Sequence, residues 1–177
     1  MKQTVFANGC FWCTEAVFTA IEGVQRVTPG YAGGSADTAN YRAVCSGQTG
    51  HAEVIEVLFD PEVVGADTLF QVFFSVAHDP TQLNRQGHDQ GTQYRSVVFA
   101  VDGAQAASVT DYIRALNESG LFDAPVVTCV ETLTAFHAAE REHHDYARQH
   151  RGQPYIEGVA VPKVEALETF WAAYRKP

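Results

Sequence analysis

Short apolar runs with the character of β-strands alternate along this chain with segments of helical spacing. The clearest strand is the apolar run 52–60, which ends at Pro61. Other strands are expected at 3–7, 97–101 and 126–131. Helices are expected at 10–22, from a cap at Asp67, at 105–119, at 134–151 and from Pro162, the last with an apolar face of Leu167, Phe170, Trp171 and Tyr174. Because helices separate most of the strands, the pattern predicts a two-layer domain in which helices cover a sheet.

Two segments lack both kinds of periodicity. The glycine- and proline-rich stretch 29–34 is expected to be a loop whose turn lets the backbone approach a site. The stretch 78–94 is long, polar and rich in hydrogen-bonding side chains. Because a loop of this length inside a compact domain is usually functional, we expect it to form a wall of that site.

The size and charge of the chain limit its class. A chain of 177 residues has the usual size of one domain, and no linker or repeat divides it, so we expect a single domain spanning 1–177. The formal net charge of −9 disfavours nucleic acid and anionic membranes as partners. Residues 1–12 contain no apolar segment of signal-peptide length, which predicts a cytoplasmic protein.

Two of the four cysteines form the motif Cys10-x-x-Cys13. Cys10 follows an expected strand and turn and begins an expected helix, where free N–H groups and the helix dipole stabilise a thiolate. Residues three apart in a helix lie about 5–6 Å apart, a separation that a disulfide accepts. Two small buried side chains would give the same spacing. We expect a redox cycle in which one thiol reacts and the other resolves the product.

Two aromatic residues, Phe11 and Trp12, directly follow Cys10. Adjacent rings form an apolar notch that fits a methyl group or a thioether, although core packing explains either ring taken alone. Gly9, before the cysteine, is typical of a turn that exposes a nucleophile. The segment is therefore expected to place a reactive thiol beside an apolar notch.

Three other classes of function share some of these residues. A thioredoxin-like dithiol–disulfide oxidoreductase would use the same two cysteines without a substrate pocket. A metal-binding module would draw on the histidines of the expected helix 134–151, but no second C-x-x-C motif completes a zinc site, and we expect no metal. The glycines at 30–34 lack the lysine and the strand–loop–helix context of a phosphate-binding loop.

Four ordered strings extend the cysteine motif over most of the chain: GCFWCTEAVF, GYAGG, YRAVCSGQTGHAEVIEVLFDP and HDPTQLNRQGHDQGTQYRS. They resemble the A-type peptide methionine sulfoxide reductases from about residue 4 to residue 151, with an extension at 152–177. The segment with Phe136, Glu140 and the later histidines resembles a weaker form of that family's aromatic, acidic and histidine segment. The resemblance implies an α+β fold, a two-layer α/β sandwich with a ferredoxin-like core and long irregular connections. It also implies reduction of methionine sulfoxide, free or in proteins, with selectivity for the S epimer.

The resemblance also implies a role for individual residues. Cys10 corresponds to the nucleophile, which becomes a sulfenic acid, and Phe11 and Trp12 correspond to the pair that cradles the methyl group of the substrate. Glu53 corresponds to the acid that protonates the sulfoxide oxygen, a role for which burial has to raise its pKa. Asp89 corresponds to the residue that anchors the substrate backbone.

Tyr41 and Tyr94 correspond to the two hydroxyl groups that hold the sulfoxide oxygen. Many family members place a resolving cysteine near the carboxyl terminus, but this chain has none after Cys129. Cys13 replaces a glycine of the common motif and is expected to be the resolving cysteine, with Cys45 and Cys129 as alternatives; the apolar strand around Cys129 predicts that its thiol is buried. The resemblance implies thioredoxin or a similar dithiol as the reductant, and we expect a monomer without a cofactor.

Overall fold

The structure is a computed structural model that describes residues 1–176. Its strands are β1 (Lys2–Asn8), β2 (Val24–Ala32), β3 (Ala52–Phe59), β4 (Arg85–Gln86), β5 (Asp89–Gln90), β6 (Ser96–Ala100), β7 (Cys129–Thr132) and β8 (Phe136–Ala138). Its α-helices are α1 (Phe11–Thr19), α2 (Tyr41–Val44), α3 (Ala66–Val72), α4 (Gly103–Ser119), α5 (Tyr146–Gln149) and α6 (Val161–Phe170). Shorter helical segments of other types are η1 (Ala36–Thr38), η2 (Phe73–Ala77), η3 (Thr92–Tyr94), η4 (Arg141–His143), η5 (Ile156–Ala160) and η6 (Ala172–Tyr174).

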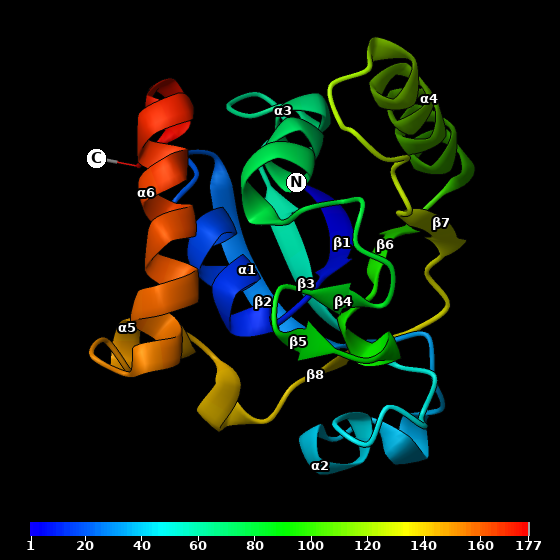
Figure 1. The fold of residues 1–177 in the computed structure, drawn as a ribbon, viewed down its shortest axis with the longest axis vertical. Coiled ribbons are helices and arrows are strands. Elements are labelled where there is room, and N and C mark those ends of the chain that lie inside the picture. The colour runs from blue at the N-terminus through cyan, green and yellow to red at the C-terminus, as the bar shows by residue number, and fades with distance from the viewer. Residues whose placement is uncertain (177) are drawn as a thin grey trace.

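The main sheet contains the strands in the order β7-β6-β1-β3-β2-β8. Neighbouring strands are antiparallel except for the parallel pair β6 and β7. The four central strands, β6-β1-β3-β2, with α1 between β1 and β2 and α3 between β3 and β6, have the order of a ferredoxin-like core. The expected α+β class is thus confirmed, and Figure 1 shows α6 and α4 at opposite sides of the molecule.

Alternate residues of the strands point to opposite faces of the sheet. Phe6 of β1 and Val98 of β6 belong to the larger hydrophobic core, to which α1, α3, α4 and α6 contribute. Val5 and Val97 belong to a smaller cluster on the other face, against which Phe136 of β8 packs. Because both faces are covered, packing fixes the ends of β1 and β3, and the cysteine motif and Glu53 lie at these ends.

The expectation of a loop at 29–34 is wrong for most of that stretch. Pro29, Gly30 and Tyr31 belong to β2, which pairs with β3 on one side and β8 on the other. A Cβ atom at Gly30 would collide with the carbonyl of His137 and the ring of Phe136. Glycine is therefore required here because the neighbouring strand approaches closely, and not because the chain turns.

The expectation of one charged helix over 134–151 is also wrong. This segment contains β8, the short turn η4 and the four-residue helix α5. Residues 136–138 extend the sheet beside β2, and Asp145 has a φ of +54°, a left-handed conformation that interrupts a helix. The gain of strand pairing at the edge of β2 outweighs the helical propensity of the charged side chains.

The carboxyl-terminal segment forms η5 and α6 in direct succession, with Pro162 in the first turn of α6 as expected. Leu167 is buried in the core, whereas Phe170 is 76% exposed and Trp171 follows the end of the helix, so the expected apolar face is only partly correct. The expected cap at Asp67 is wrong, because Gly65 occupies the capping position of α3. None of the helices within residues 1–176 is long and apolar enough to cross a membrane.

Candidate active site

Cys10 lies where β1 ends and α1 begins. Gly9, just before it, has a φ of +99°, and a Cβ atom there would lie 2.8 Å from the Cβ atom of Gln86, so this tight turn requires glycine. The carbonyl of Cys10 accepts hydrogen bonds from the backbone N–H groups of Cys13 at 3.2 Å and Thr14 at 3.4 Å. The predicted position of Cys10 after a strand and turn, at the start of a helix, is confirmed.

Cys13 lies in the first turn of α1 and is 1% exposed. It packs against Ile156 and Ala160 of η5, and its Sγ lies 4.0 Å from the hydroxyl oxygen of Tyr155. Its place one helical turn from Cys10 agrees with the separation of about 5–6 Å between Cα atoms that a disulfide accepts. The two thiols can therefore be joined without a large movement of the backbone.

Burial changes the ionisation of the cysteine pair. The pKa of Cys10 is raised well above its usual value, first by burial, then by the hydrogen bond with Cys13 and the charge of Glu53. The pKa of Cys13 is lowered, chiefly by its hydrogen bond with Cys10 and further by the charge of Lys163. The expectation that the helix start lowers the pKa of Cys10 is therefore wrong here, because burial destabilises the thiolate by more than the helix dipole stabilises it. Cys10 rests as a thiol.

Glu53 is a buried carboxyl group on β3, with an exposed fraction of 2%. Its Oε2 accepts a hydrogen bond from the backbone N–H of Phe11 at 3.1 Å, which places the carboxyl group beside the residue after Cys10. Burial raises the pKa of Glu53 to about 8; the Phe11 hydrogen bond opposes this shift and the charge of Asp89 adds to it. At neutral pH most Glu53 side chains are protonated, so the group can donate a proton.

Tyr41 and Tyr94 come from separate elements and approach the same site. Tyr41 begins α2, and Tyr94 ends η3 after the polar stretch 78–94. Burial raises the pKa of both phenols, and the charges of Glu53 and Cys10 raise both further. Both hydroxyl groups therefore remain protonated hydrogen-bond donors close to the cysteine and the carboxyl group.

Aromatic rings form one side of the site. Phe11 is buried, and its ring centroid lies 6.3 Å from that of Tyr41 with the planes inclined by 14°. The indole of Trp12 stacks on Tyr146 at 3.9 Å and lies 6.2 Å from the ring of Tyr41. Such a wall can receive an apolar methyl group.

Asp89 lies on the small β4–β5 hairpin within the polar stretch 78–94. Its Oδ2 accepts a hydrogen bond from the hydroxyl of Tyr155, the same hydroxyl that approaches Cys13. Burial raises the pKa of Tyr155, and the charges of Cys10 and Cys13 raise it further. Through Asp89 and Tyr155 the polar stretch lies beside the cysteine pair, and that it forms a wall of the site stays a prediction.

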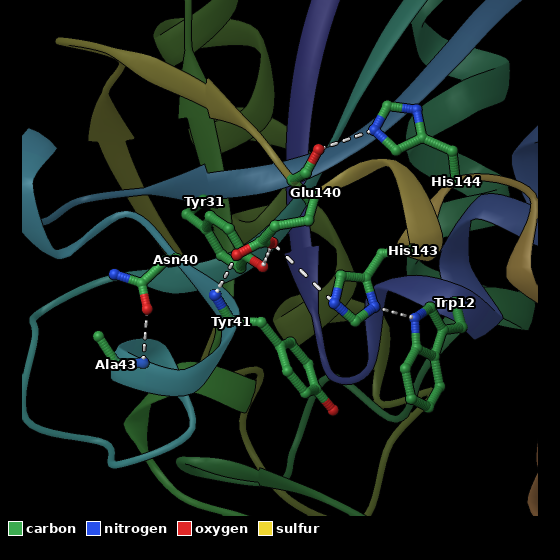
Figure 2. Close-up of polar contacts among 9 residues, drawn as sticks. Trp12, Tyr31, Asn40, Tyr41, Ala43, Glu140, His143 and His144 are labelled. Atoms are coloured by element: carbon green, nitrogen blue, oxygen red, sulfur yellow. Dashed lines mark hydrogen bonds and ion pairs between the residues drawn. The ribbon is translucent and has the colours of Figure 1, made fainter.

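Figure 2 shows a hydrogen-bonded group that joins the aromatic wall to the segment after β8. Glu140 accepts hydrogen bonds from the hydroxyl of Tyr31 and the backbone N–H of Tyr41, each at 2.7 Å. Nε2 of His143 lies 4.0 Å from Oε2 of Glu140, and Nδ1 of His143 accepts a hydrogen bond from Nε1 of Trp12 at 3.2 Å. Burial lowers the pKa of His143, which favours the neutral ring that can accept this bond. Glu140 thus holds the backbone of Tyr41, and His143 holds the side chain of Trp12.

The sequence does not assign these supporting residues to the site. Glu140 and His143 belong to a segment that resembles the family only weakly, and the wrong helix prediction places them on a solvated face. Tyr155 lies in the extension after the expected match. For Glu140 and His143, the one sequence feature that indicates a place in the site is the weak family resemblance of the aromatic, acidic and histidine segment. For Tyr155, no local motif indicates such a place.

The Glu140 contacts predict a loss of stability on substitution. Glu140→Ala should lower the free energy of unfolding by about 1–3 kcal/mol, because the buried hydroxyl of Tyr31 loses its acceptor. Equilibrium denaturation in urea measures the change. Tyr31→Phe removes the same hydrogen bond, so the double variant should lose less than the sum of the two single variants; additive losses would contradict the coupling.

The two remaining cysteines lie in different surroundings. Cys45 follows α2, is exposed, and lies near the hydroxyl group of Tyr41. Cys129 is exposed on β7, an edge strand of the sheet, so the expectation of a buried thiol is wrong. The edge position explains the difference, because the apolar strand has a neighbour on one side only.

The late histidines do not share one helix face. His137 is on β8 and His143 in η4, while His144 and His150 bond to the carbonyls of Ala139 and Tyr146 at 2.9 Å each. Within residues 1–176, no three side chains of histidine, cysteine, aspartate or glutamate are grouped to hold a metal ion.

Comparison with known proteins identifies the family. The family model described as peptide methionine sulfoxide reductase matches residues 2–174. The peptide methionine sulfoxide reductase MsrA of Chromobacterium violaceum is 48% identical over 167 residues, which cover 94% of each chain.

Solved structures agree with this result. The reduced form of Mxr1 from Saccharomyces cerevisiae has a TM-score of 0.78 at 31% identity and covers 86% of this chain and 87% of its own. Methionine sulfoxide reductase A of Corynebacterium diphtheriae has a TM-score of 0.73 at 35% identity, covering 84% and 74% of the two chains. Mxr1 in complex with Trx2 matches at 24% identity with a TM-score of 0.55, which shows the shared fold. The chain therefore belongs to the peptide methionine sulfoxide reductase family and is an oxidoreductase that reduces methionine sulfoxide.

Proposed function

We propose that this chain reduces methionine-S-sulfoxide, free or in proteins, by transfer of the sulfoxide oxygen to Cys10. The observation that carries the proposal is the buried carboxyl group of Glu53, which has a pKa of about 8 and is bonded to the backbone of Phe11 beside the cysteine. A sulfoxide is a poor electrophile until its oxygen is protonated or strongly hydrogen-bonded. A thiol next to a protonated carboxyl group meets this requirement.

Substrate binding uses the three parts of the site. The methyl group lies against Phe11 and Trp12, the hydroxyl groups of Tyr41 and Tyr94 donate hydrogen bonds to the oxygen, and Asp89 anchors the substrate backbone. The rings of Trp12 and Phe11 lie 6.2 and 6.3 Å from the ring of Tyr41, which supports an apolar wall for the methyl group. The raised pKa values of Tyr41 and Tyr94 keep both hydroxyl groups protonated, which supports their role as donors to the oxygen. These contacts distinguish this site from that of a general dithiol oxidoreductase, which needs no such pocket.

Oxygen transfer oxidises Cys10 and reduces the substrate. Glu53 gives its proton to the sulfoxide oxygen, the Cys10 sulfur attacks the sulfoxide sulfur, and the Cys10 proton replaces the one that Glu53 gave up. The hydroxyl group then passes to the Cys10 sulfur as its bond to the methionine sulfur breaks. Methionine leaves, and Cys10 becomes a sulfenic acid. The reactive form therefore has both Glu53 and Cys10 protonated.

Resolution and recycling complete the cycle. Cys13 attacks the sulfenic acid, water leaves, and a Cys10–Cys13 disulfide forms. A second dithiol, thioredoxin or a similar reductant, reduces this disulfide by exchange. The complex of the relative Mxr1 with Trx2 supports thioredoxin as the reductant. In this proposal the chain acts as a single domain and a monomer in the cytoplasm, without a cofactor, to repair oxidised protein.

The selectivity of the site tests the proposal. The S epimer of N-acetylmethionine sulfoxide should be reduced at least about a hundredfold faster than the R epimer, because only one epimer presents its oxygen to Glu53 while its methyl group faces the aromatic wall. Chromatographic measurement of methionine formation with dithiothreitol as reductant gives both rates. Equal rates, or disulfide exchange without methionine formation, would contradict the proposal.

A further inference from the structure

We propose that Lys163 is a positioning residue of the resolving step, whose ammonium group is held beside the cysteine pair and stabilises the Cys13 thiolate that attacks the Cys10 sulfenic acid. The inference rests on the proposed function, because it assigns a residue to the step that Cys13 performs. It concerns α6, a part of the chain to which the sequence gives no role other than covering the core.

The fold places Lys163 on the face of the carboxyl-terminal helix that covers the cysteines. Ile156 and Ala160 of η5 are buried against Cys13, and Lys163 follows Ala160 by three residues in the continuous helical segment. Residues at this spacing lie on one helix face. Nζ of Lys163 donates a hydrogen bond to the carbonyl oxygen of Ala77 at 2.7 Å, which ties α6 to the end of η2.

The surroundings of Lys163 are unusual for a lysine. Burial lowers its pKa, and the charges of Cys13, Cys10 and Asp89 act in the opposite direction, so these groups lie close enough to stabilise the ammonium. Burial lowers the pKa of the neighbouring His78 to about 3, and the charge of Lys163 lowers it further. His78 is therefore neutral at neutral pH. A half-buried cation beside two thiols favours their ionised forms.

The charges around Cys13 show why a cation is useful there. The side chains that face this thiol or act on it each carry a negative charge or none. They are those of Cys10, Tyr155, Asp89 and Glu53. Lys163 supplies a positive charge at this position, and its charge lowers the pKa of Cys13. Without it, the negative charge of Asp89 would oppose ionisation of the attacking thiol.

The assisted step is balanced as follows. Cys13 loses its proton, its sulfur bonds to the sulfur of Cys10, and the sulfur–oxygen bond of the sulfenic acid breaks. The leaving hydroxide takes up the proton and departs as water, so Cys13 is oxidised and the Cys10 sulfenic acid is reduced to the disulfide. Because the thiolate is the attacking form, the rate follows the ionised fraction of Cys13 until ionisation is complete.

The test compares three variants in a single turnover with one equivalent of S-sulfoxide. Lys163→Met removes the charge, Lys163→Arg keeps it, and Lys176→Met removes another lysine that donates to a backbone carbonyl, that of Thr19. Quenched samples are analysed for methionine, which reports oxygen transfer, and for the Cys10–Cys13 disulfide, which reports resolution. Both rates are measured across a range of pH.

For Lys163→Met we expect the pH midpoint of disulfide formation to rise by about one unit, with an approximately tenfold slower rate on the rising limb. Oxygen transfer should change by less, and Lys163→Arg and Lys176→Met should keep the wild-type midpoint. An unchanged midpoint in Lys163→Met, or the same shift in Lys176→Met, would overturn the role of Lys163. Absence of methionine or of the disulfide in the wild type would instead contradict the proposed function itself.

A direct titration separates charge from folding. In the triple variant Cys10→Ser/Cys45→Ser/Cys129→Ser, Cys13 is the single thiol of the chain, and its thiolate absorbs near 240 nm, so absorbance gives its pKa. Adding Lys163→Met should raise that pKa by about one unit, while Lys163→Arg should not. A pKa that stays the same in both would show that Lys163 only fills space.

Discussion

Replacement of Cys10 by serine is expected to abolish methionine formation, whereas Cys13→Ser should release one methionine per chain and then stop. Serine at position 10 offers a hydroxyl group that is far less nucleophilic than a thiol and cannot form a sulfenic acid. Cys13 is not needed to take the oxygen, but without it the oxidised Cys10 has no partner one helical turn away. Thioredoxin-dependent turnover of Cys13→Ser should fall by at least about a hundredfold.

The exposed cysteines provide the matched controls. Cys45→Ser and Cys129→Ser should turn over with thioredoxin at nearly the wild-type rate, since neither thiol lies one helical turn from Cys10. A coupled assay that follows oxidation of the nicotinamide reductant of thioredoxin measures all four variants. Retained turnover in Cys13→Ser, lost on the further change Cys45→Ser, would move the resolving role to Cys45.

Glu53→Gln should lower kcat/KM for sulfoxide reduction by a factor of about 10² to 10⁴, the usual contribution of a general acid. Glutamine keeps an oxygen that can accept from the N–H of Phe11 but cannot transfer a proton to the sulfoxide. In the wild type, kcat/KM should be constant below pH 8 and fall as the pH rises through the Glu53 pKa of about 8, because ionisation removes the transferable proton. Glu53→Gln should lack this fall.

Stability provides the control for Glu53→Gln. The carboxyl group has a pKa of about 8 when folded against an ordinary value of 4.5, so its ionisation between these values favours the unfolded chain. The stability of the wild type should therefore decrease as the pH rises from 4.5 to 8, and this contribution should be missing in the variant. Thermal denaturation at pH 7 should show Glu53→Gln to be at least as stable as the wild type. If the variant were less stable and partly unfolded, unfolding would explain its low activity. That result would contradict this account of the burial of Glu53.

The strands and the cysteine motif could be predicted because their signals are local. The apolar run 52–60 and the strand–turn–helix around Cys10 depend on period and turn residues within a few positions. The edge strand β8 could not, because its conformation depends on pairing with Gly30 and its neighbours, which lie about a hundred residues earlier. The same long-range pairing brings Glu140 beside Tyr41.

The pKa of Cys10 could not be predicted from the sequence alone. A helix start favours a thiolate at Cys10, but the depth of burial, which raises its pKa, depends on how the carboxyl-terminal segment covers the site. Tyr155 and Lys163 come from this segment, and no motif marks them. For Glu53, in contrast, the expected role required a raised pKa, and the buried strand position provides it.

The most direct test of the central claim is a single turnover of the fully reduced protein with one equivalent of S-sulfoxide, followed by intact mass and disulfide mapping. The account predicts one methionine per chain, a mass lower by about two hydrogen atoms, and a disulfide that joins Cys10 to Cys13. Methionine formed with a different cysteine pair joined, or a chain that keeps all four thiols, would contradict it.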